Sequence, residues 1–182
     1  MLERALITHA SPTLARLKTG SLFAVPHRID RLTGDIRRLN DILLPRGVRL
    51  LALRCEDTRT LLYLYRVRLL RETLARPDVQ ALLACYGYQR FTLPAALLTL
   101  RTRLNATDSF PHEIGLFLGY PPEDVIGFIR NKGRNCLCSG CWKAYANAAE
   151  ARRTFARYKK CRAVYARRYA EGVPLSRLTV RA

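Results

Sequence analysis

The pattern of apolar and polar positions in the first third of the chain predicts helices and strands in turn. Residues 30–44 carry apolar side chains at intervals of three and four, which is helical spacing, and Pro45 and Gly47 follow where such a helix would end. Residues 48–54 and 60–66 are β-type runs joined by a short polar segment, so they predict a β-hairpin. This hairpin is the clearest strand signal in the chain.

Two weaker signals precede that helix. Ser11 is a favourable N-cap, Pro12 suits the first helical position, and Gly20 stands where helices commonly terminate. We therefore predict a short helix that begins at Ser11. Residues 21–25 form a short apolar run, which predicts a third strand.

Beyond residue 66 the apolar spacing is helical. Helices are predicted at 67–75, 78–86, 92–104, 111–118, 122–130 and 142–169, the last with a break near Asn147, and a final turn is predicted at 174–178. The predicted fold class is therefore α+β: a small two- or three-stranded antiparallel sheet packed by many helices, with a helical C-terminal part. We expect a single domain over 1–182, with an α+β core at 1–134 and a basic, cysteine-containing helical part at 135–182.

Composition favours a folded protein outside the membrane. Apolar residues make up 49% and charged residues 25% of the chain. No apolar run approaches the roughly 20 residues that a membrane helix needs. The first residues also lack the basic start and apolar stretch of a secretory signal peptide. We therefore expect a cytoplasmic protein with no membrane partner.

Positive charge is concentrated at the C-terminal end. The chain has 32 Lys and Arg against 14 Asp and Glu, a net charge of +18, and residues 130–182 hold 14 of the basic but 2 of the acidic residues. A field of this sign attracts polyanions, so the expected partner is nucleic acid or an acidic protein, bound with low specificity. The alternative is a solvated basic face with incidental affinity. The candidate polyanion-binding residues are Arg152, Arg153, Arg157, Lys159, Lys160, Arg167 and Arg168.

The strongest chemical cluster is a set of thiols. Cys136, Cys138 and Cys141 lie within six residues, Gly140 permits a tight loop, and Cys161 follows on the last predicted helix. Four thiolates are the ligand set of zinc or of an iron–sulfur cluster, and the spacing of Cys138 and Cys141 places two sulfurs on one ion. Two alternatives stay open at this point, a redox dithiol and ordinary unreactive thiols.

Five polar side chains are candidates for other chemistry: His9, Lys18, His112, Glu113 and Lys143. General acid–base catalysis would need the first four within hydrogen-bond reach of one another, and we expect no such pocket and assign no catalytic residue. For Glu113 the simpler interpretation is that its carboxylate offsets the positive end of a helix. Lys143 adjoins the cysteine loop, where a positive charge favours thiolates.

Two further patterns have a functional and a structural interpretation. Residues 111–130 have helix-turn-helix spacing, but so has any helix pair, and Glu123 and Asp124 would point carboxylates at DNA phosphates. The last predicted helix carries an aromatic stripe, which predicts a buried face, with a base-stacking surface as the alternative. The stripe consists of Phe155, Tyr158, Tyr165 and Tyr169.

Several segments together resemble a known family. The block FPHEIGLFLGYPPEDVIGFI at 110–129 is distinctive, and so are HASPTL at 9–14, SGCWKAY at 139–145 and FARYKKC at 155–161. Together they resemble a family of bacterial proteins catalogued as domain of unknown function 3793, over nearly the whole chain. The family has no established activity, so the resemblance implies no catalytic residue.

The hypothesis that accounts best for these patterns is an uncharacterised cytoplasmic accessory or binding protein, not an enzyme. Its candidate cofactor is zinc or an iron–sulfur cluster, held by the C-terminal cysteines. The first alternative is a nucleic-acid-binding protein that uses the basic C-terminal surface. The second is an enzyme with a site near His9, Lys18, His112 and Glu113.

Overall fold

The computed structural model describes residues 1–106 and 110–181. The chain divides into two compact units. The first unit comprises Met1–Leu70 together with Cys161–Ala182, and the second comprises Arg71–Lys160. The first unit is therefore discontinuous in sequence, whereas the second is continuous.

This division does not follow the segments expected from the sequence. Leu175 and Leu178, near the C-terminus, belong to the apolar core of the first unit. Apolar burial, which is not visible in local composition, therefore joins the two ends of the chain. Residues 1–134 and 135–182 are not the two units, and the behaviour of the chain as one domain stays a prediction.

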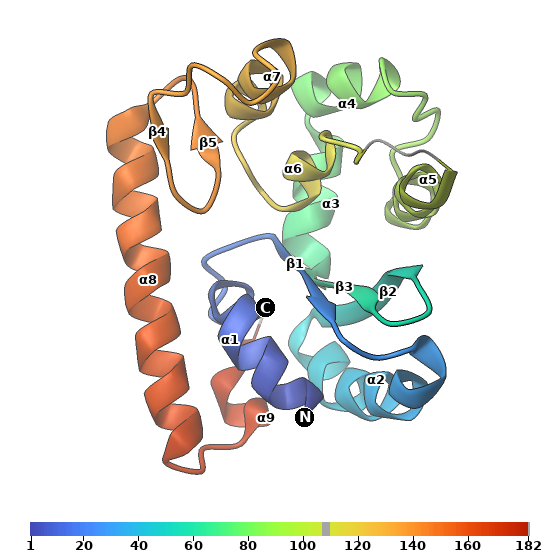
Figure 1. Cartoon of the computed structure of the whole chain (residues 1–182), viewed down its shortest axis with the longest axis vertical. Helices are drawn as coiled ribbons and strands as arrows, with labels where there is room; N and C mark the ends of the chain where they lie inside the picture. The colour runs from blue at the N-terminus through green and yellow to red at the C-terminus, as the bar shows by residue number, and fades with distance from the viewer. Residues whose placement is uncertain (107–109, 182) are drawn as a thin grey trace. The chain divides into compact units, whose positions relative to one another are not determined.

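The first unit contains a three-stranded antiparallel sheet (Figure 1). Its strands are β1 (Gly20–Val25), β2 (Val48–Cys55) and β3 (Thr60–Arg66), in the order β1-β3-β2. β3 pairs with β2 through the predicted hairpin and with β1 along its other edge. A register shift between Ala52 and Arg54 marks a bulge in β2. The three predicted strands are confirmed, and so is the α+β class.

Helices α1 (Leu2–Leu14), α2 (Ile29–Leu43) and α9 (Leu175–Leu178) pack on one face of this sheet (Figure 1). The 3-10 helix Leu44–Arg46 links α2 to β2. Burial of apolar side chains from all these elements is the main source of stability of the unit. The core consists of Leu2, Leu6, Ile7, Ala10, Leu14, Phe23, Val25, Leu32, Leu39, Leu43, Val48, Leu50, Leu62, Leu64, Leu175 and Leu178.

The predicted start of the first helix is wrong. α1 begins at Leu2 instead of Ser11, and Pro12 lies in its last turn. A proline in a helix removes one backbone hydrogen bond, but so close to the helix end little regular structure is lost, and burial of the apolar face of α1 outweighs the cost. Ser11 does not cap the helix, because its hydroxyl donates to the carbonyl oxygen of Ile7. Gly20 is the first residue of β1.

Arg66, the last residue of β3, holds the C-terminal end of α1. Its side chain is almost fully buried, its Nε donates to the carbonyl oxygen of Thr13 at 2.7 Å, and its Nη2 donates to that of Leu14. A cation at this position offsets the negative end of the helix dipole and satisfies carbonyls of the last turn. Burial lowers the pKa of Arg66 to about 10, so the guanidinium stays charged at neutral pH.

The second unit is mainly helical. Its helices begin and end close to the predicted bounds, apart from the fourth. They are α3, which starts in the first unit (Val67–Ala75), α4 (Pro77–Ala84), α5 (Leu93–Ala106), α6 (Ile114–Phe117) and α7 (Pro122–Arg130). α6 is a single turn because the residues before it use tighter hydrogen bonds, such as Ile114 N to Pro111 O at 3.1 Å.

A short hairpin replaces the start of the last predicted helix. β4 (Cys138–Ser139) and β5 (Lys143–Ala144) pair antiparallel, and α8 (Ala148–Ala170) begins only after them. The helix prediction is therefore wrong for the residues before α8. The predicted break marks the true start, since Asn147 Oδ1 accepts a hydrogen bond from the backbone N of Glu150 at 3.0 Å, as an N-cap does.

α8 continues through the boundary between the units. Its first part, up to Lys160, belongs to the second unit, and the rest belongs to the first. With 23 residues it would be long enough for a bilayer, but basic residues recur along its whole length. Among the helices of the described chain, none combines the length and the apolar character that crossing a membrane requires.

Candidate functional site

The three clustered thiols lie on the β4–β5 hairpin in the second unit. Gly140 N donates to the carbonyl oxygen of Trp142 at 3.0 Å and closes the turn. The thiol of Cys138 makes a long hydrogen bond, 3.8 Å, to the carbonyl oxygen of Ala148 at the start of α8. The hairpin thus holds three half-buried thiols on one loop: Cys136, Cys138 and Cys141.

A buried carboxylate fastens this hairpin to α7. Asp124, in the first turn of α7, is only 4% exposed. Its Oδ2 accepts a hydrogen bond from Trp142 Nε1 at 2.7 Å, and its Oδ1 accepts from the backbone N of Tyr145 at 2.7 Å and of Ala146 at 3.0 Å. Hydrogen bonds to an ionised acceptor are about twice as strong as neutral ones, so Asp124 fixes the position of the hairpin.

The burial of Asp124 bears on the helix-turn-helix hypothesis for residues 111–130. The helix-turn-helix hypothesis places Asp124 on a surface that would face DNA, whereas in the structure its carboxylate faces the hairpin. The first helix of the pair is the single turn α6. The structure therefore favours the interpretation of a tight helix pair that supports the hairpin.

Cys161 lies on the part of α8 that belongs to the first unit and is 8% exposed. Burial raises the pKa of its thiol to about 11. Over residues 1–106 and 110–181, no group of three or more His, Cys, Asp or Glu side chains is arranged to hold a metal ion. The zinc or iron–sulfur site formed by Cys136, Cys138, Cys141 and Cys161 therefore stays a prediction.

Differences in thiol reactivity follow from this burial. At pH 8, iodoacetamide is expected to modify Cys55 and Cys85, which are exposed, long before Cys161. Because the thiolate is the nucleophile, raising the thiol pKa from 9 to about 11 lowers its ionised fraction by about 100-fold. Mass spectrometry of peptides from samples taken at successive times measures the modification rate of each cysteine. In urea the six rates should converge, and equal rates in the native protein would contradict the burial of Cys161.

α8 separates an aromatic face from a basic one. Tyr158 is 6% exposed, and the ring of Phe155 packs edge-on against that of Trp142 with centroids 4.5 Å apart. Tyr165 and Tyr169 pack against the core of the first unit. The stripe therefore packs against the protein, with Tyr158 buried and the other three rings half-buried, which agrees with the predicted inward face and leaves little ring surface for stacking on nucleic-acid bases. The seven candidate polyanion-binding residues are all exposed: Arg152, Arg153, Arg157, Lys159, Lys160, Arg167 and Arg168.

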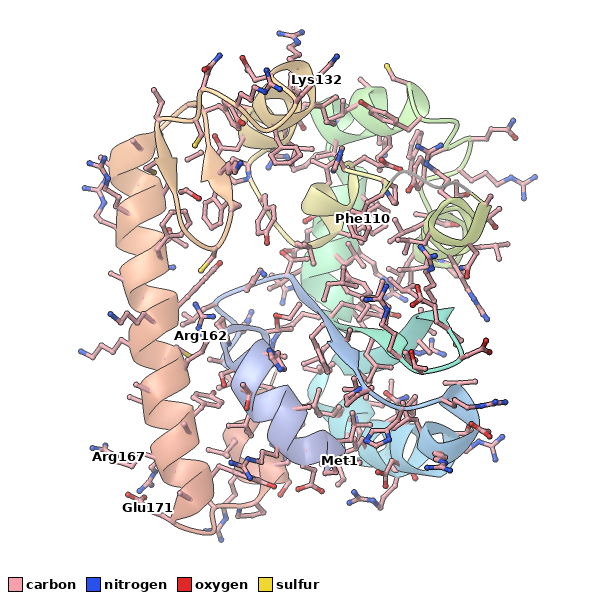
Figure 2. The ribbon with its side chains drawn as sticks, viewed as in Figure 1. Met1, Phe110, Lys132, Arg162, Arg167 and Glu171 are labelled. Carbon is pink, nitrogen blue, oxygen red and sulfur yellow. The ribbon has the colours of Figure 1, made fainter. Side chains whose placement is uncertain are left out.

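Carboxylates of the described residues pair with this basic face at its two ends. Glu150 pairs with Arg153 at 2.9 Å near the start of α8. At the other end, Glu171 accepts from Arg168 Nη1 at 3.0 Å and lies 3.8 Å from Arg167 Nε (Figure 2). Between these ends, four basic side chains have no carboxylate within ion-pair distance in the part of the chain that the structure describes. They are Arg152, Arg157, Lys159 and Lys160.

In the first unit, His9 is exposed and its ring stacks on that of Phe23, with centroids 5.5 Å apart. With His27 and Met1 it lines a small cavity of about 120 Å³. Lys18 is half-buried and is not among the residues that line this cavity. This cavity therefore does not bring His9 and Lys18 together.

In the second unit, Glu113 takes part in a buried ion pair. It is 1% exposed, and its Oε1 accepts a hydrogen bond from Arg103 Nε at 2.5 Å and from Tyr88 Oη at 3.3 Å. His112 is exposed instead, with its ring edge-on to Phe128 at 4.9 Å. Glu113 stands before α6, as predicted, but its hydrogen bonds join α6 to α5 and do not assemble an acid–base pair with His112.

Two side chains that anchor these elements, Asp124 and Arg103, could not be recognised from the sequence. Asp124 was visible as an acid in the first turn of a helix, but its partners are an indole 18 residues later and backbone amides 21 and 22 residues later, and no local sequence pattern reveals hydrogen bonds over that separation. Arg103 had no signal beyond its charge. Lys143 donates from Nζ to the carbonyl oxygen of Gly133 at 2.7 Å, which shows that the hairpin is also tied to the end of α7.

Comparison with known proteins gives one match. A family model described as Protein of unknown function (DUF3793) matches residues 6–179. The matched segment contains the hairpin, Asp124 and all of α8. No curated protein and no solved structure matches the chain.

Proposed function

Because this chain belongs to the DUF3793 family, whose function is unknown, we propose a function from its surface: it is a cytoplasmic binding protein that holds nucleic acid through the exposed basic face of α8. The observation that supports this proposal is a group of four exposed basic residues in the second unit. No carboxylate of the described chain lies within ion-pair distance of them. These are Arg152, Arg157, Lys159 and Lys160. The proposal involves no catalytic step and no metal.

Helix geometry places these four side chains within reach of one phosphate backbone. At a rise of about 1.5 Å per residue, Arg152 and Lys160 are about 12 Å apart along the axis, which corresponds to about three or four phosphates of one strand. The buried positions Ala151, Tyr158 and Cys161 define the opposite side of the helix. All four charges can therefore contact a polyanion together.

The same face predicts low specificity. Sequence is read by hydrogen bonds to base edges or by stacking, and the aromatic side chains of α8 are buried or half-buried against the protein. Lys and Arg contacts to phosphate carry no sequence information. We therefore expect RNA and DNA to bind with similar affinity and strong salt dependence.

The test measures RNA affinity over a series of salt concentrations, for the native protein and for a variant whose α8 face carries no charge at these four positions. Changing Arg152, Arg157, Lys159 and Lys160 to glutamine is expected to reduce the slope of log K against log salt for single-stranded RNA by about 3, since about 0.7 counterions are released per phosphate contact. At 50 mM salt, affinity should fall by at least about tenfold. Fluorescence anisotropy with labelled oligonucleotides measures both quantities.

A matched variant separates this face from the overall charge. Changing the exposed Arg31, Arg37, Arg49 and Arg90 to glutamine removes the same net charge from other surfaces and should alter the slope far less. Equal effects of the two variants would show that the positive field in general, not α8, attracts RNA. A competition experiment tests the class of partner. If polyglutamate competes with bound RNA as strongly as DNA of equal charge does, the partner class is acidic protein and not nucleic acid.

A further inference from the structure

The second unit contains a cavity of about 330 Å³ beside the hairpin. Its wall is formed by residues from the segment before α6, from α6 and α7, from the turn between these helices and from the hairpin. Cavities that hold small organic molecules start at about this size. The cavity lies apart from the basic face of α8, because none of the four charged residues proposed above lines it in the described structure.

Fixed aromatic rings form one wall of the cavity. The rings of Tyr120 and Trp142 are stacked with centroids 5.0 Å apart and an angle of 26° between planes. Both polar groups of this pair are engaged inside the protein, Trp142 Nε1 with Asp124 and Tyr120 Oη with the carbonyl oxygen of Cys141 at 3.1 Å. The ring positions are therefore set before any ligand enters, which lowers the entropy cost of binding a flat molecule.

Two glycines let the walls come this close. A Cβ on Gly115 would lie 2.8 Å from Val125 Cγ2 and 3.2 Å from the ring of Tyr120. A Cβ on Gly140 would collide with the ring of Phe155, which itself supports Trp142. Both glycines line the cavity. The shape of the cavity thus depends on the close packing of the helix pair and the hairpin at these two glycines.

The polar groups that remain free in the cavity suit an anion. Lys143 lies 6.0 Å over the ring of Phe128, and its bond to Gly133 uses one of three ammonium donors. The ring nitrogens of His112 have no hydrogen-bond partner among the described residues. Asp124, the carboxylate on the wall, is already satisfied by three donors. A ligand therefore meets aromatic faces, a cation and an imidazole.

We infer that this cavity binds a planar aromatic anion, with its ring against Trp142 and Tyr120 and its acid group beside Lys143. The aromatic wall selects a flat apolar body, and the unneutralised ammonium selects a negative charge at its edge. A neutral analogue of the same shape keeps the ring contacts but loses the ion pair. The inference stands independently of the proposed nucleic-acid binding, since no residue is shared.

Trp142 allows a direct test because it is the single tryptophan of the chain and lines the cavity. Benzoate and its neutral analogue benzamide are titrated while Trp142 emission is followed with excitation at 295 nm. Benzoate should change the emission saturably, and benzamide should bind at least about fivefold more weakly because it lacks the charge. Equal affinities, or no saturable change with either probe, would overturn the inference.

Variants at the cation sharpen the result. Lys143→Gln should weaken benzoate about five- to tenfold and leave benzamide unchanged, while Lys143→Arg keeps the charge and should retain binding. Lys132→Gln removes an exposed charge that does not line the cavity and is the matched control (Figure 2). If Lys132→Gln weakens benzoate as much as Lys143→Gln does, the effect is general charge attraction and the inference fails. RNA anisotropy on the same variants should be unaltered.

Discussion

Replacement of Asp124 by alanine is expected to lower the free energy of unfolding of the second unit by about 3–5 kcal/mol. The change deletes an ionised acceptor and leaves Trp142 Nε1 and the backbone N of Tyr145 and Ala146 without their partner in a buried setting. Domain stabilities are typically about 5–15 kcal/mol, so the loss is severe. Urea unfolding followed by Trp142 emission and by circular dichroism measures it.

Two further variants serve as controls for this prediction. Asp124→Asn keeps one oxygen for the backbone donors of the hairpin but turns an NH₂ group toward the indole N–H, so we expect roughly half of the loss. Glu123→Ala changes the neighbouring, exposed carboxylate of the same helix turn and should shift stability by no more than about 0.5 kcal/mol. If Asp124→Ala unfolds like the Glu123→Ala variant, Asp124 does not hold the hairpin.

Glu113→Ala is the second change with a large expected effect, a loss of about 3 kcal/mol. It leaves Arg103 and the buried hydroxyl of Tyr88 without their shared acceptor. Breaking a buried ion pair from one side costs about 3–5 kcal/mol, and the lower end applies because Arg103 is 31% exposed. Thermal and urea unfolding of the purified variant provide the measurement.

A double-mutant cycle distinguishes an interaction from general damage. Glu113→Ala with Arg103→Ala should be less destabilised than the sum of the single variants by about 1–3 kcal/mol, because the double variant removes both members of the ion pair together. Asp78→Ala breaks an exposed ion pair of the same unit with Arg76 at 2.6 Å and should cost no more than about 1 kcal/mol. Strict additivity at Glu113 and Arg103 would contradict direct coupling.

The parts of the fold that follow from local patterns were predictable from the sequence. The β2–β3 hairpin consists of two apolar runs of β-type residues joined by a short polar segment, and α2 repeats its apolar residues at helical intervals, so each element has its own local signal. The start of α1 was not predictable from Ser11 and Pro12. Their local preference for a helix start is outweighed by the burial of residues ahead of them, such as Leu6.

Of the candidate functional site, only the positive charge of the α8 face could be predicted from the sequence. The basic face of α8 follows from composition and helical spacing, and the exposure of its arginines and lysines agrees with that. The β4–β5 hairpin has two residues in each strand, too few to show a period, and is held by Asp124 from another element. The cavity beside Trp142 depends on contacts of Gly115 and Gly140 that exist only once the chain has folded.

The split sequence of the first unit determines the order in which a growing chain can fold on the ribosome. Leu175 and Leu178 close the core that α1 begins, and the backbone N of Val180 donates to the carbonyl oxygen of Leu14 at 3.0 Å. Synthesis proceeds from the N-terminus, so every residue of the second unit emerges before the first unit has all of its own. The sheet and α1 therefore keep an open apolar face until Leu175 and Leu178 have been synthesised, and during that interval they need protection from aggregation.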